Sequence, residues 1–557
     1  MTADLVLHNG VVHTLDPALI GASAIALGGG RILAVGDEAT VREHVSGNAE
    51  SIDLGGRTVL PGFQDGHVHA SGAGIERNRC NLTEAHSRQE YLDTVARYAK
   101  AHPDAAWITG GGWSMDVFPG GVPTKEDLDR VVPDRPVLLF NRDHHGAWAN
   151  SVALERAGID ARTPDPVDGR IERDAKGEPV GMLQEGASDL VGRHIPELTT
   201  EEIAAGILEG QRYLHSFGIT AWQEAIVGES PVVGDCFDAF LALDRAGLLT
   251  GKVVGAQWWP RGADETFIST LLDRREQASK GSHFRADSVK FMQDGICENF
   301  TAAMLTPYLD RAGHETHNCG KSFFSPEELT SYVTLVDAHG FQAHFHAIGD
   351  RAVREVLDAA EAARAANGTS DRRHCAAHIQ VVHPDDISRF AQVGVIANGQ
   401  PLWACAEPQM VELTLPFLGP ERSSWQYPFG SLVRAGARLC FGSDWPVSTP
   451  NVLEEVHVAV NRTVPPDHAH AGADGGGTDP LLPSERVDLE TAIEAFTAGS
   501  AYLNHLEQET GSITPGKRAD LVVLDRDLFS VPTSEIALVE VDLTFADGKI
   551  VHDRGVL

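Results

Sequence analysis

The sequence has little basic charge and no long apolar run. Lysine and arginine together number 45 against 79 aspartate and glutamate residues, which gives a net charge of −34 at pH 7. An acidic excess of this size repels nucleic-acid backbones and anionic membrane surfaces, so we expect neither as a partner. No stretch reaches the roughly 18 apolar residues that a membrane span requires. The N-terminus also lacks a basic signal region, and we expect a cytoplasmic protein.

Cysteine is scarce and irregularly placed. The seven cysteines are odd in number, and no Cys-x-x-Cys pair occurs among them. This pattern argues against a disulfide framework and against a zinc ribbon. It is typical of reduced thiols in a cytosolic protein.

The two ends of the chain share one character, because both consist of short strands with tight turns. Asn9-Gly10 and Gly28–Gly30 mark turns near the start, and Asp547-Gly548 marks one near the end. We expect residues 1–58 and 511–557 to form one small β-sandwich domain. The expected strands cover 4–9, 11–15, 23–27, 31–35 and 51–53 at one end, and 511–513, 519–524, 539–545 and 549–552 at the other.

Residues 59–510 alternate short apolar runs with amphipathic helices, a pattern typical of βα units around a parallel sheet. The eight expected strands match the number in a (β/α)8 barrel, so we predict an α/β fold of the TIM-barrel type. The gap at 70–215 is too long for one crossover and predicts an insert that covers the active-site mouth. The expected strands are 58–69, 218–222, 252–258, 288–292, 341–346, 375–380, 394–397 and 438–441.

Several helices in this region begin with a recognisable cap. Ser325-Pro326-Glu327-Glu328 forms a capping box with proline at the first helical position. The segments 199–202 and 87–90 repeat the capping-box pattern. We therefore expect helices to start at these three points.

Side chains that can bind metal fall at the ends of five of the eight expected strands. Active-site residues of such a barrel lie at the carboxyl ends of its strands, and His67 and His69 share one face because they are two apart. Imidazole nitrogen favours zinc-like ions over calcium or magnesium, so this set predicts two such ions. The expected ligands are His67, His69, Lys290, His346, His378 and Asp444.

Lys290 is the unusual member of this set, because a protonated ammonium group cannot bind a cation. Either it forms an ion pair, or burial has removed its charge and it has reacted with carbon dioxide to give a carbamate that bridges two metals. The chain has nine lysines and 36 arginines, so the usual surface role falls mostly to arginine. That bias slightly favours the carbamate, although the residues alone leave both interpretations open.

A series of short motifs resembles the amidohydrolase superfamily, specifically its YtcJ-like branch, which includes N-substituted formamide deformylases. The resemblance extends in order over nearly the whole chain. It implies a metal-bearing barrel flanked by a β-sandwich, with Lys290 as a carboxylated bridging ligand, and it does not identify the substrate. The motifs are Leu60–Phe63 before His67-Val68-His69, Val289–Phe291 with Asp294-Gly295, His346–Ala352, Ala377–Gln380, Phe441–Val447 and Pro515–Leu521.

Some candidates around the metal ligands have two interpretations. His344 shares a face with His346, but the His346–Ala352 motif favours His346 as ligand and leaves His344 behind it or in the core. His145 matches a motif typical of the branch, and it is either a group that polarises the substrate or a surface histidine. Trp113 and Trp148 are expected to line the substrate pocket, although a buried tryptophan usually belongs to a core. The glycine-rich segment 469–478, flanked by His468, is expected to be a loop near the barrel mouth.

These ligands predict hydrolysis by a metal-activated hydroxide. We expect His145 to help polarise the substrate carbonyl, and Asp444 to pass a proton to the leaving nitrogen. The expected substrate is a small molecule with a non-peptide C–N bond, such as an N-substituted amide, a formamide or a carbamate. A one-metal deaminase, which would not need Lys290, and a non-catalytic ligand-binding barrel are the alternatives. The sequence leaves the oligomeric state open, with a homodimer as the default expectation.

Overall fold

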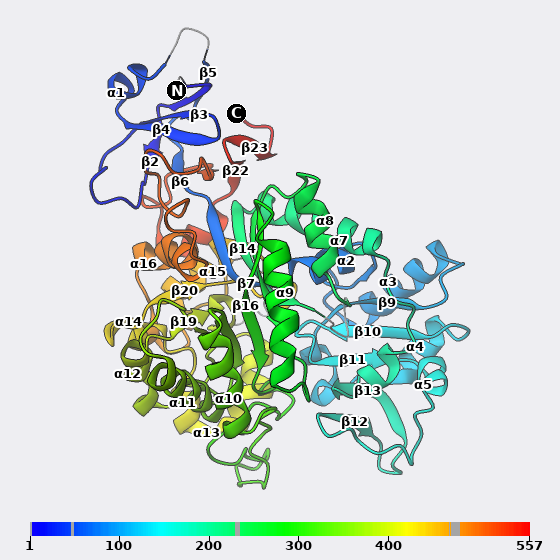
Figure 1. Cartoon of the computed structure of the whole chain (residues 1–557). Helices are drawn as coiled ribbons and strands as arrows, with labels where there is room; N and C mark the ends of the chain where they lie inside the picture. The colour runs from blue at the N-terminus through cyan, green and yellow to red at the C-terminus, as the bar shows by residue number, and fades with distance from the viewer. Residues whose placement is uncertain (1–2, 46–48, 229–233, 467, 469–478) are drawn as a thin grey trace.

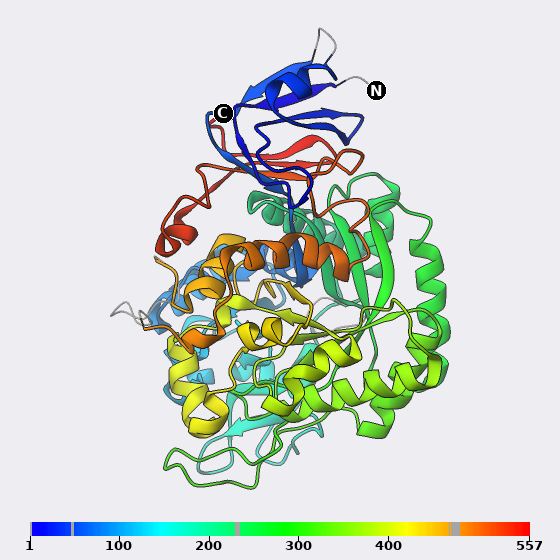
Figure 2. The same cartoon turned by 90° about the vertical axis from the view of Figure 1, so that its left-hand side faces the viewer.

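The computed structural model describes residues 3–45, 49–228, 234–466, 468 and 479–557. A barrel of parallel strands forms its centre, and the segment inserted after the first barrel strand lies beside it (Figure 1). The two chain ends meet in a separate β domain on the barrel, where blue and red strands lie side by side (Figure 2). The α/β barrel class predicted from the sequence is confirmed.

Eight parallel strands form the barrel, in the order β7-β14-β15-β16-β17-β18-β19-β20. The loop after β20 closes the ring, because the Asp444 N–H donates to the His67 carbonyl at 2.7 Å. Each expected barrel strand overlaps one strand of the observed barrel. The strands are β7 (Phe63–Val68), β14 (Ile219–Val227), β15 (Lys252–Trp258), β16 (Phe284–Met292), β17 (Gln342–Ala347), β18 (Cys375–His378), β19 (Ile396–Gly399) and β20 (Leu439–Phe441).

Helices cover the outside of the barrel, and others belong to the insert and the terminal domain. Three helices start at the caps expected from the sequence. Complete capping boxes begin α7 (Thr200–Ser216) and α10 (Pro326–Ala338). At Ser87 only half of the box forms, because the Glu90 carboxylate accepts from the His86 N–H at 2.7 Å. Within the described ranges, no helix has the length and apolarity needed to cross a membrane. The other helices are α1 (Glu38–Arg42), α2 (Ala70–Arg77), α3 (Arg88–Ala101), α4 (Lys125–Val131), α5 (Ser151–Ala157), α6 (Asp189–Gly192), α8 (Phe237–Arg245), α9 (Ile268–Ala278), α11 (Asp350–Asn367), α12 (Pro384–Val393), α13 (Leu415–Ser423), α14 (Phe429–Arg434), α15 (Val452–Asn461), α16 (Leu489–Glu494) and α17 (Ser500–Leu503).

The terminal domain pairs a four-stranded sheet, β4-β3-β1-β5, with a five-stranded sheet, β2-β6-β21-β22-β23. Apolar residues from both sheets, among them Leu7 and Phe545, are buried in one cluster. The expected strand at 511–513 is wrong, since this segment forms no strand and the Ile513 N–H donates to the Thr14 carbonyl. The strands are β1 (Leu5–His8), β2 (Val11–Val12), β3 (Ala24–Gly28), β4 (Arg31–Gly36), β5 (Glu50–Asp53), β6 (Thr58–Pro61), β21 (Leu521–Leu524), β22 (Val541–Ala546) and β23 (Lys549–Asp553).

The chain passes from the terminal domain into the barrel at Gly62. The sequence suggests one continuous run over 58–69, yet β6 pairs with β2 and β21, and only β7 belongs to the barrel. Neighbouring N–H groups show the change of partner, since Gly62 donates to the Asp520 carbonyl at 2.8 Å and Phe63 to the Gly218 carbonyl at 2.9 Å. The first ligand-bearing strand is therefore anchored to the terminal domain.

The insert contains a six-stranded sheet, ordered β12-β13-β11-β10-β9-β8. One apolar cluster of the insert includes Trp113 and another includes Leu138. Residues 70–215 also include α2 and α7, which pack against each other. This helix pair joins the inserted sheet to the barrel. The strands are β8 (Cys80–Asn81), β9 (Ile108–Trp113), β10 (Val137–Asn141), β11 (Gly146–Ala149), β12 (Gly169–Arg173) and β13 (Pro179–Glu185).

Candidate metal centre

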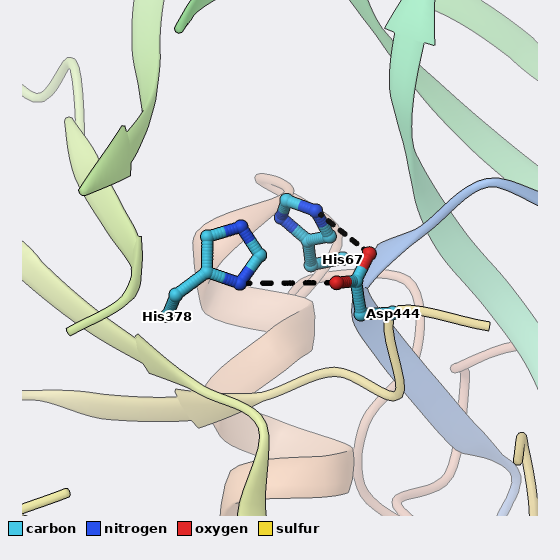
Figure 3. Close-up of side chains that lie close together, drawn as sticks. All are labelled: His67, His378 and Asp444. Carbon is cyan, nitrogen blue, oxygen red and sulfur yellow. Dashed lines mark ion pairs between the residues drawn. The ribbon is translucent and has the colours of Figure 1, made fainter. Parts of the chain in front are cut away.

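Three of the expected ligands point toward one another at the carboxyl ends of the barrel strands (Figure 3). His67 Nε2 lies 3.3 Å from Asp444 Oδ1, and His378 Nδ1 lies 3.9 Å from Asp444 Oδ2. One ligand atom from each residue falls within 4.8 Å of the other two. Side chains from β7, β18 and the loop after β20 can therefore reach a single ion.

The other three expected ligands surround this group. His69 Nε2 lies 3.2 Å from Asp444 Oδ1, and the His346 ring centroid is 4.5 Å from that of His378. Lys290 on β16 is 1% exposed, and it lines a cavity that His69, His346 and His378 also line. The structure thus brings all six residues to one end of the barrel.

The surroundings of these histidines favour the neutral form, which has a lone pair available to a cation. Burial lowers the pKa values of His67, His346 and His378 well below the usual 6.5, and the positive charge of Lys290 lowers them further. Burial alone would raise the pKa of Asp444, but His67 and His69 outweigh it and keep this group a carboxylate. Neutral imidazoles around one carboxylate are a donor set for a zinc-like ion.

The buried polar atoms also fit a metal. In the part of the chain that the structure describes, His67 Nε2, His378 Nδ1 and Asp444 Oδ1 are buried without a hydrogen bond. Leaving such atoms unpartnered costs about 1–3 kcal/mol each. A cation bound between them would satisfy all three at once. His346 has a different arrangement, because its Nε2 lies 3.3 Å from the Gly295 carbonyl and only Nδ1 is left for an ion.

Lys290 is chemically able to become a carbamate. Burial lowers its pKa to about 8, although the Asp444 carboxylate opposes this shift. A part of the population is then a neutral amine near pH 7, which is the form that reacts with carbon dioxide. Because burial removes its solvation, Lys290 loses its proton more readily than a surface lysine does.

Asp65 holds the ends of β7 and β20 together. Its carboxylate accepts the N–H groups of His67 and Ser443 at 3.0 Å each, and the Ser443 hydroxyl at 2.5 Å. A Cβ on Gly442 would lie 2.3 Å from the His67 nitrogen, so only glycine permits this approach. The Gly442-Ser443-Asp444 motif therefore fixes the position of Asp444 relative to His67.

Two of the candidate ligands have strained backbone conformations. Asp444 has φ 53° and His378 has φ 76°, in the left-handed region that non-glycine residues rarely adopt. Such conformations cost of order 1–3 kcal/mol and are frequent at functional sites. Asp444 is held in this conformation by two hydrogen bonds, because its N–H donates to the His67 carbonyl and its carbonyl accepts from the Val447 N–H.

His145 reaches the centre from the insert. Its ring centroid is 5.4 Å from that of His346, and its Nδ1 lies 2.8 Å from Glu185 Oε2. Burial lowers the pKa of His145, but the Glu185 carboxylate outweighs burial and raises it to about 9. The Thr301 hydroxyl holds the other Glu185 oxygen at 2.6 Å. His145 is thus an imidazolium close to the candidate ligands.

Sequence reasoning missed Glu185 and did not consider His144. The His144 ring lies 3.4 Å from the Glu76 carboxylate, and this ion pair outweighs burial to raise the pKa of His144. The only sequence signal for Glu185 was its place at the end of an apolar run, before Gly186. Contacts between segments distant in the sequence pair Glu185 with His145 and Glu76 with His144.

A cavity of about 1070 Å³ leads from the candidate centre to the insert. Trp403, in the short helix Pro401–Trp403, stacks on His378 with 5.5 Å between ring centroids. The expected pocket walls, Trp113 and Trp148, are corrected: both are fully buried in the insert and neither lines this cavity. Their rings pack together with that of Phe118, so these tryptophans stabilise the insert.

Most of the loop expected near the barrel mouth lies outside the residues that the structure describes. Residues 469–478 do not belong to the described residues. His468 does, and its Nδ1 lies 2.7 Å from Glu454 Oε2.

The sequence of this chain matches the amidohydrolase family and several full-length relatives. The model of the amidohydrolase family matches residues 50–552. Protein LONG AFTER FAR-RED 3 of Arabidopsis thaliana is 32% identical over 562 residues, covering 99% of this chain and 92% of that protein. Putative amidohydrolase YtcJ of Bacillus subtilis (strain 168) is 29% identical, covering 98% and 99%. N-substituted formamide deformylase of Arthrobacter pascens is also 29% identical, covering 99% and 98%.

Solved structures show the same fold. An uncharacterized metal-dependent hydrolase from Pyrococcus horikoshii OT3 aligns with a TM-score of 0.73 and 26% identity, over 95% of this chain and 99% of that one. Together, the family match, the full-length relatives and the barrel establish the family of this chain. The chain belongs to the YtcJ-like branch of the amidohydrolase family and is a metal-dependent hydrolase of carbon–nitrogen bonds.

Proposed function

We propose that the enzyme hydrolyses the C–N bond of a small, non-peptide N-substituted amide, formamide or carbamate with the help of two zinc-like ions. The observation that carries this proposal is the convergence of unpartnered atoms of His67, His378 and Asp444 at the barrel mouth. The resemblance to N-substituted formamide deformylase over 99% of the chain supports the substrate class.

In this proposal His67, His69, His346, His378, Asp444 and a carboxylated Lys290 hold the ions. Bound ions of this kind act as Lewis acids and bring the pKa of a bound water toward 7. The protein contributes the imidazoles, the fixed carboxylate and a cavity of about 1070 Å³ beside them.

Asp444 and His145 move and hold the protons of the reaction. Asp444 Oδ1 accepts the proton of the attacking water and returns it to the leaving nitrogen, which would otherwise depart as an unstable amide anion. The His145 imidazolium donates a hydrogen bond to the substrate carbonyl oxygen and stabilises the negative charge that develops there. Glu185 keeps His145 protonated and oriented for this donation.

A second candidate is a deaminase-type hydrolase with one ion. It is favoured by the fact that, among the described residues, only His67, His378 and Asp444 form a tight ligand group. Such an enzyme would not need Lys290 as a bridge. Elemental analysis distinguishes the two, because the first proposal expects two ions per chain and the second expects one.

The substrate class is tested with the metal-loaded enzyme and a panel of N-substituted formamides, acyl-amines, carbamates and lactams. We expect turnover of at least one of these classes, loss of turnover after chelation, and recovery when zinc is restored. A loaded enzyme that hydrolyses none of them but deaminates purine-like rings contradicts the proposal. Catalysis by neither route would favour a non-catalytic barrel.

We also propose that this activity is cytoplasmic and acts on small molecules. The seven cysteines are all unpaired, which suits a reducing compartment. The net charge of −34 disfavours nucleic acid and anionic membranes as partners, and a homodimer stays the default expectation for the assembly.

A further inference from the structure

A second histidine lies directly behind the first candidate ligand. His344 on β17 is fully buried, does not line the cavity, and places its Nε2 2.7 Å from His67 Nδ1. Its other nitrogen, Nδ1, lies 2.7 Å from Gln223 Oε1 on β14. His67 therefore has a partner on the side away from Asp444, and that partner is itself held by an amide.

The chain of hydrogen bonds continues to a fixed end. Gln223 Nε2 donates to Gln342 Oε1 at 2.7 Å. Gln342 Nε2 donates to the carbonyls of Arg373 and Leu503, both at 2.8 Å. Because a carbonyl can only accept, these two contacts fix which Gln342 atom is nitrogen.

The fixed orientation of the Gln342 amide determines which atom donates in every hydrogen bond of this series. Gln342 Oε1 must accept, so Gln223 donates with its nitrogen and accepts with its oxygen. A neutral His344 then carries its proton on Nδ1, facing Gln223, and has a lone pair on Nε2. His67 must therefore carry its proton on Nδ1, which leaves the Nε2 lone pair directed at Asp444.

We propose that Gln342, Gln223 and His344 form a relay that fixes the His67 tautomer so that Nε2 is always available to the ion. The inference rests on the proposed metal centre and assigns positioning roles to three residues that do not bind the ion themselves. Without the relay, His67 would distribute between two tautomers, and only one can bind through Nε2. Outer partners of metal-bound histidines typically contribute a factor of about 10–100 in metal affinity.

The relay predicts that replacing His344 weakens metal binding, whereas replacing a buried histidine elsewhere does not. We compare zinc dissociation constants, measured by chelator competition, for the parent, His344→Leu and the matched control His215→Leu. His215 is also buried and makes two side-chain hydrogen bonds of 2.8 Å, but it lies on α7 outside the cavity lining. We expect about 10–100-fold weaker binding in His344→Leu and no change in His215→Leu.

Gentler variants keep the test valid if His344→Leu does not fold. Gln223→Met preserves the volume and removes the relay one residue away from His67, and Gln257→Met on the adjacent β15 is its control, since Gln257 is also fully buried. We expect weaker zinc binding only in Gln223→Met. In His344→Gln, the amide oxygen can still accept from His67 Nδ1, so affinity should recover in part.

The outcomes separate the relay from the proposed function. If the parent binds zinc and His344→Leu and Gln223→Met bind it as tightly as their controls, the relay is wrong while the metal centre stands. A purely structural role would lower the melting temperature of variants and controls alike without this difference in affinity. A parent that binds no zinc overturns both proposals.

Discussion

At the residue scale, Asp444 combines several constraints in one side chain. It contacts His67 and His69, keeps a depressed pKa despite burial, and adopts a left-handed backbone conformation. Its Oδ1 has no hydrogen bond in the described chain. These features suit a group that both binds an ion and exchanges a proton.

Asp444→Asn tests the proton transfer with almost no change of shape. General acid–base catalysis typically contributes about 10²–10⁴-fold, so we expect kcat on the best amide substrate to fall by about that factor. Asp386→Asn is the control, because Asp386 is also buried but pairs with Arg354 on the outside of the barrel. A variant that keeps its metal and turns over amides at the parent rate would show that Asp444 is no proton shuttle.

Lys290→Ala tests the carbamate bridge. We expect metal content to fall from two ions per chain toward one, and bicarbonate to stimulate reconstitution of the parent but not of the variant. Lys252→Ala is the matched control, since Lys252 is similarly buried but pairs with Asp520 at the opposite end of the barrel. Two tightly bound ions in Lys290→Ala, with no bicarbonate effect in either protein, would exclude the bridge.

At the scale of elements, the contact between α2 and α7 holds the insert on the barrel. The two helices approach so closely that a Cβ on Gly74 would lie 1.9 Å from the Gly206 carbonyl oxygen, and one on Gly210 would lie 2.3 Å from the Ala70 carbonyl oxygen. Backbone atoms make this contact, so no side chain can change its rotamer to make room for an added Cβ. His69 immediately precedes α2, and the packing therefore also places a candidate ligand.

Gly74→Ala should accordingly separate the two helices. Overpacking costs about 1–3 kcal/mol, which exceeds the intrinsic helix preference of alanine over glycine, so we expect lower stability in urea denaturation. Gly192→Ala in α6 has nothing within 4 Å of the new Cβ and should be neutral or slightly stabilising. Equal stability of the two variants would mean that α2 and α7 are not tightly packed in solution.

At the scale of the whole molecule, the terminal domain is joined to the barrel by charges at the end opposite the candidate centre. Asp547, in the turn between β22 and β23, lies 3.1 Å from Lys252 Nζ and 2.9 Å from His283 Nε2. Arg518 approaches the same carboxylate at 3.0 Å. Residues at the amino ends of barrel strands typically serve stability, and this network fits that rule.

Asp547→Ala should weaken the joint in a pH-dependent way. Burial raises the pKa of Asp547, but His283, Lys252 and Arg518 outweigh it and hold the pKa below its ordinary 3.8. The stabilisation is therefore complete above pH 3.8 and is lost as the pH falls further. We expect a loss of about 1–3 kcal/mol at pH 7, limited because Lys252 keeps Asp520, and a smaller difference from the parent at pH 3.

An exposed pair provides the control for this experiment. Glu38→Gln removes a surface partner of Arg42, and we expect its unfolding free energy to change by less than about 0.5 kcal/mol at either pH. A constant difference between Asp547→Ala and the parent from pH 7 to pH 3 would contradict the role of the carboxylate charge.

The order of the ligands along the chain could be predicted because it depends on local patterns. Apolar runs alternate with helices at βα spacing, and His67, His346, His378 and Asp444 stand at or just after the ends of such runs. A barrel brings strand ends together whatever the details of its packing. The eight strands and the gathering of six polar residues were therefore available from the sequence.

Other features depended on contacts between distant segments. An aromatic residue suits both a core and a pocket wall, so only the packing of Trp113 on Trp148 decided between them. The pairing of His145 with Glu185 and of His67 with His344 joins strands that no local pattern relates. The sequence by itself determined which side chains reach the barrel mouth, because periodicity and strand order are local. Only the tertiary structure decided their charge and tautomer, because burial and hydrogen-bond partners come from elsewhere in the chain.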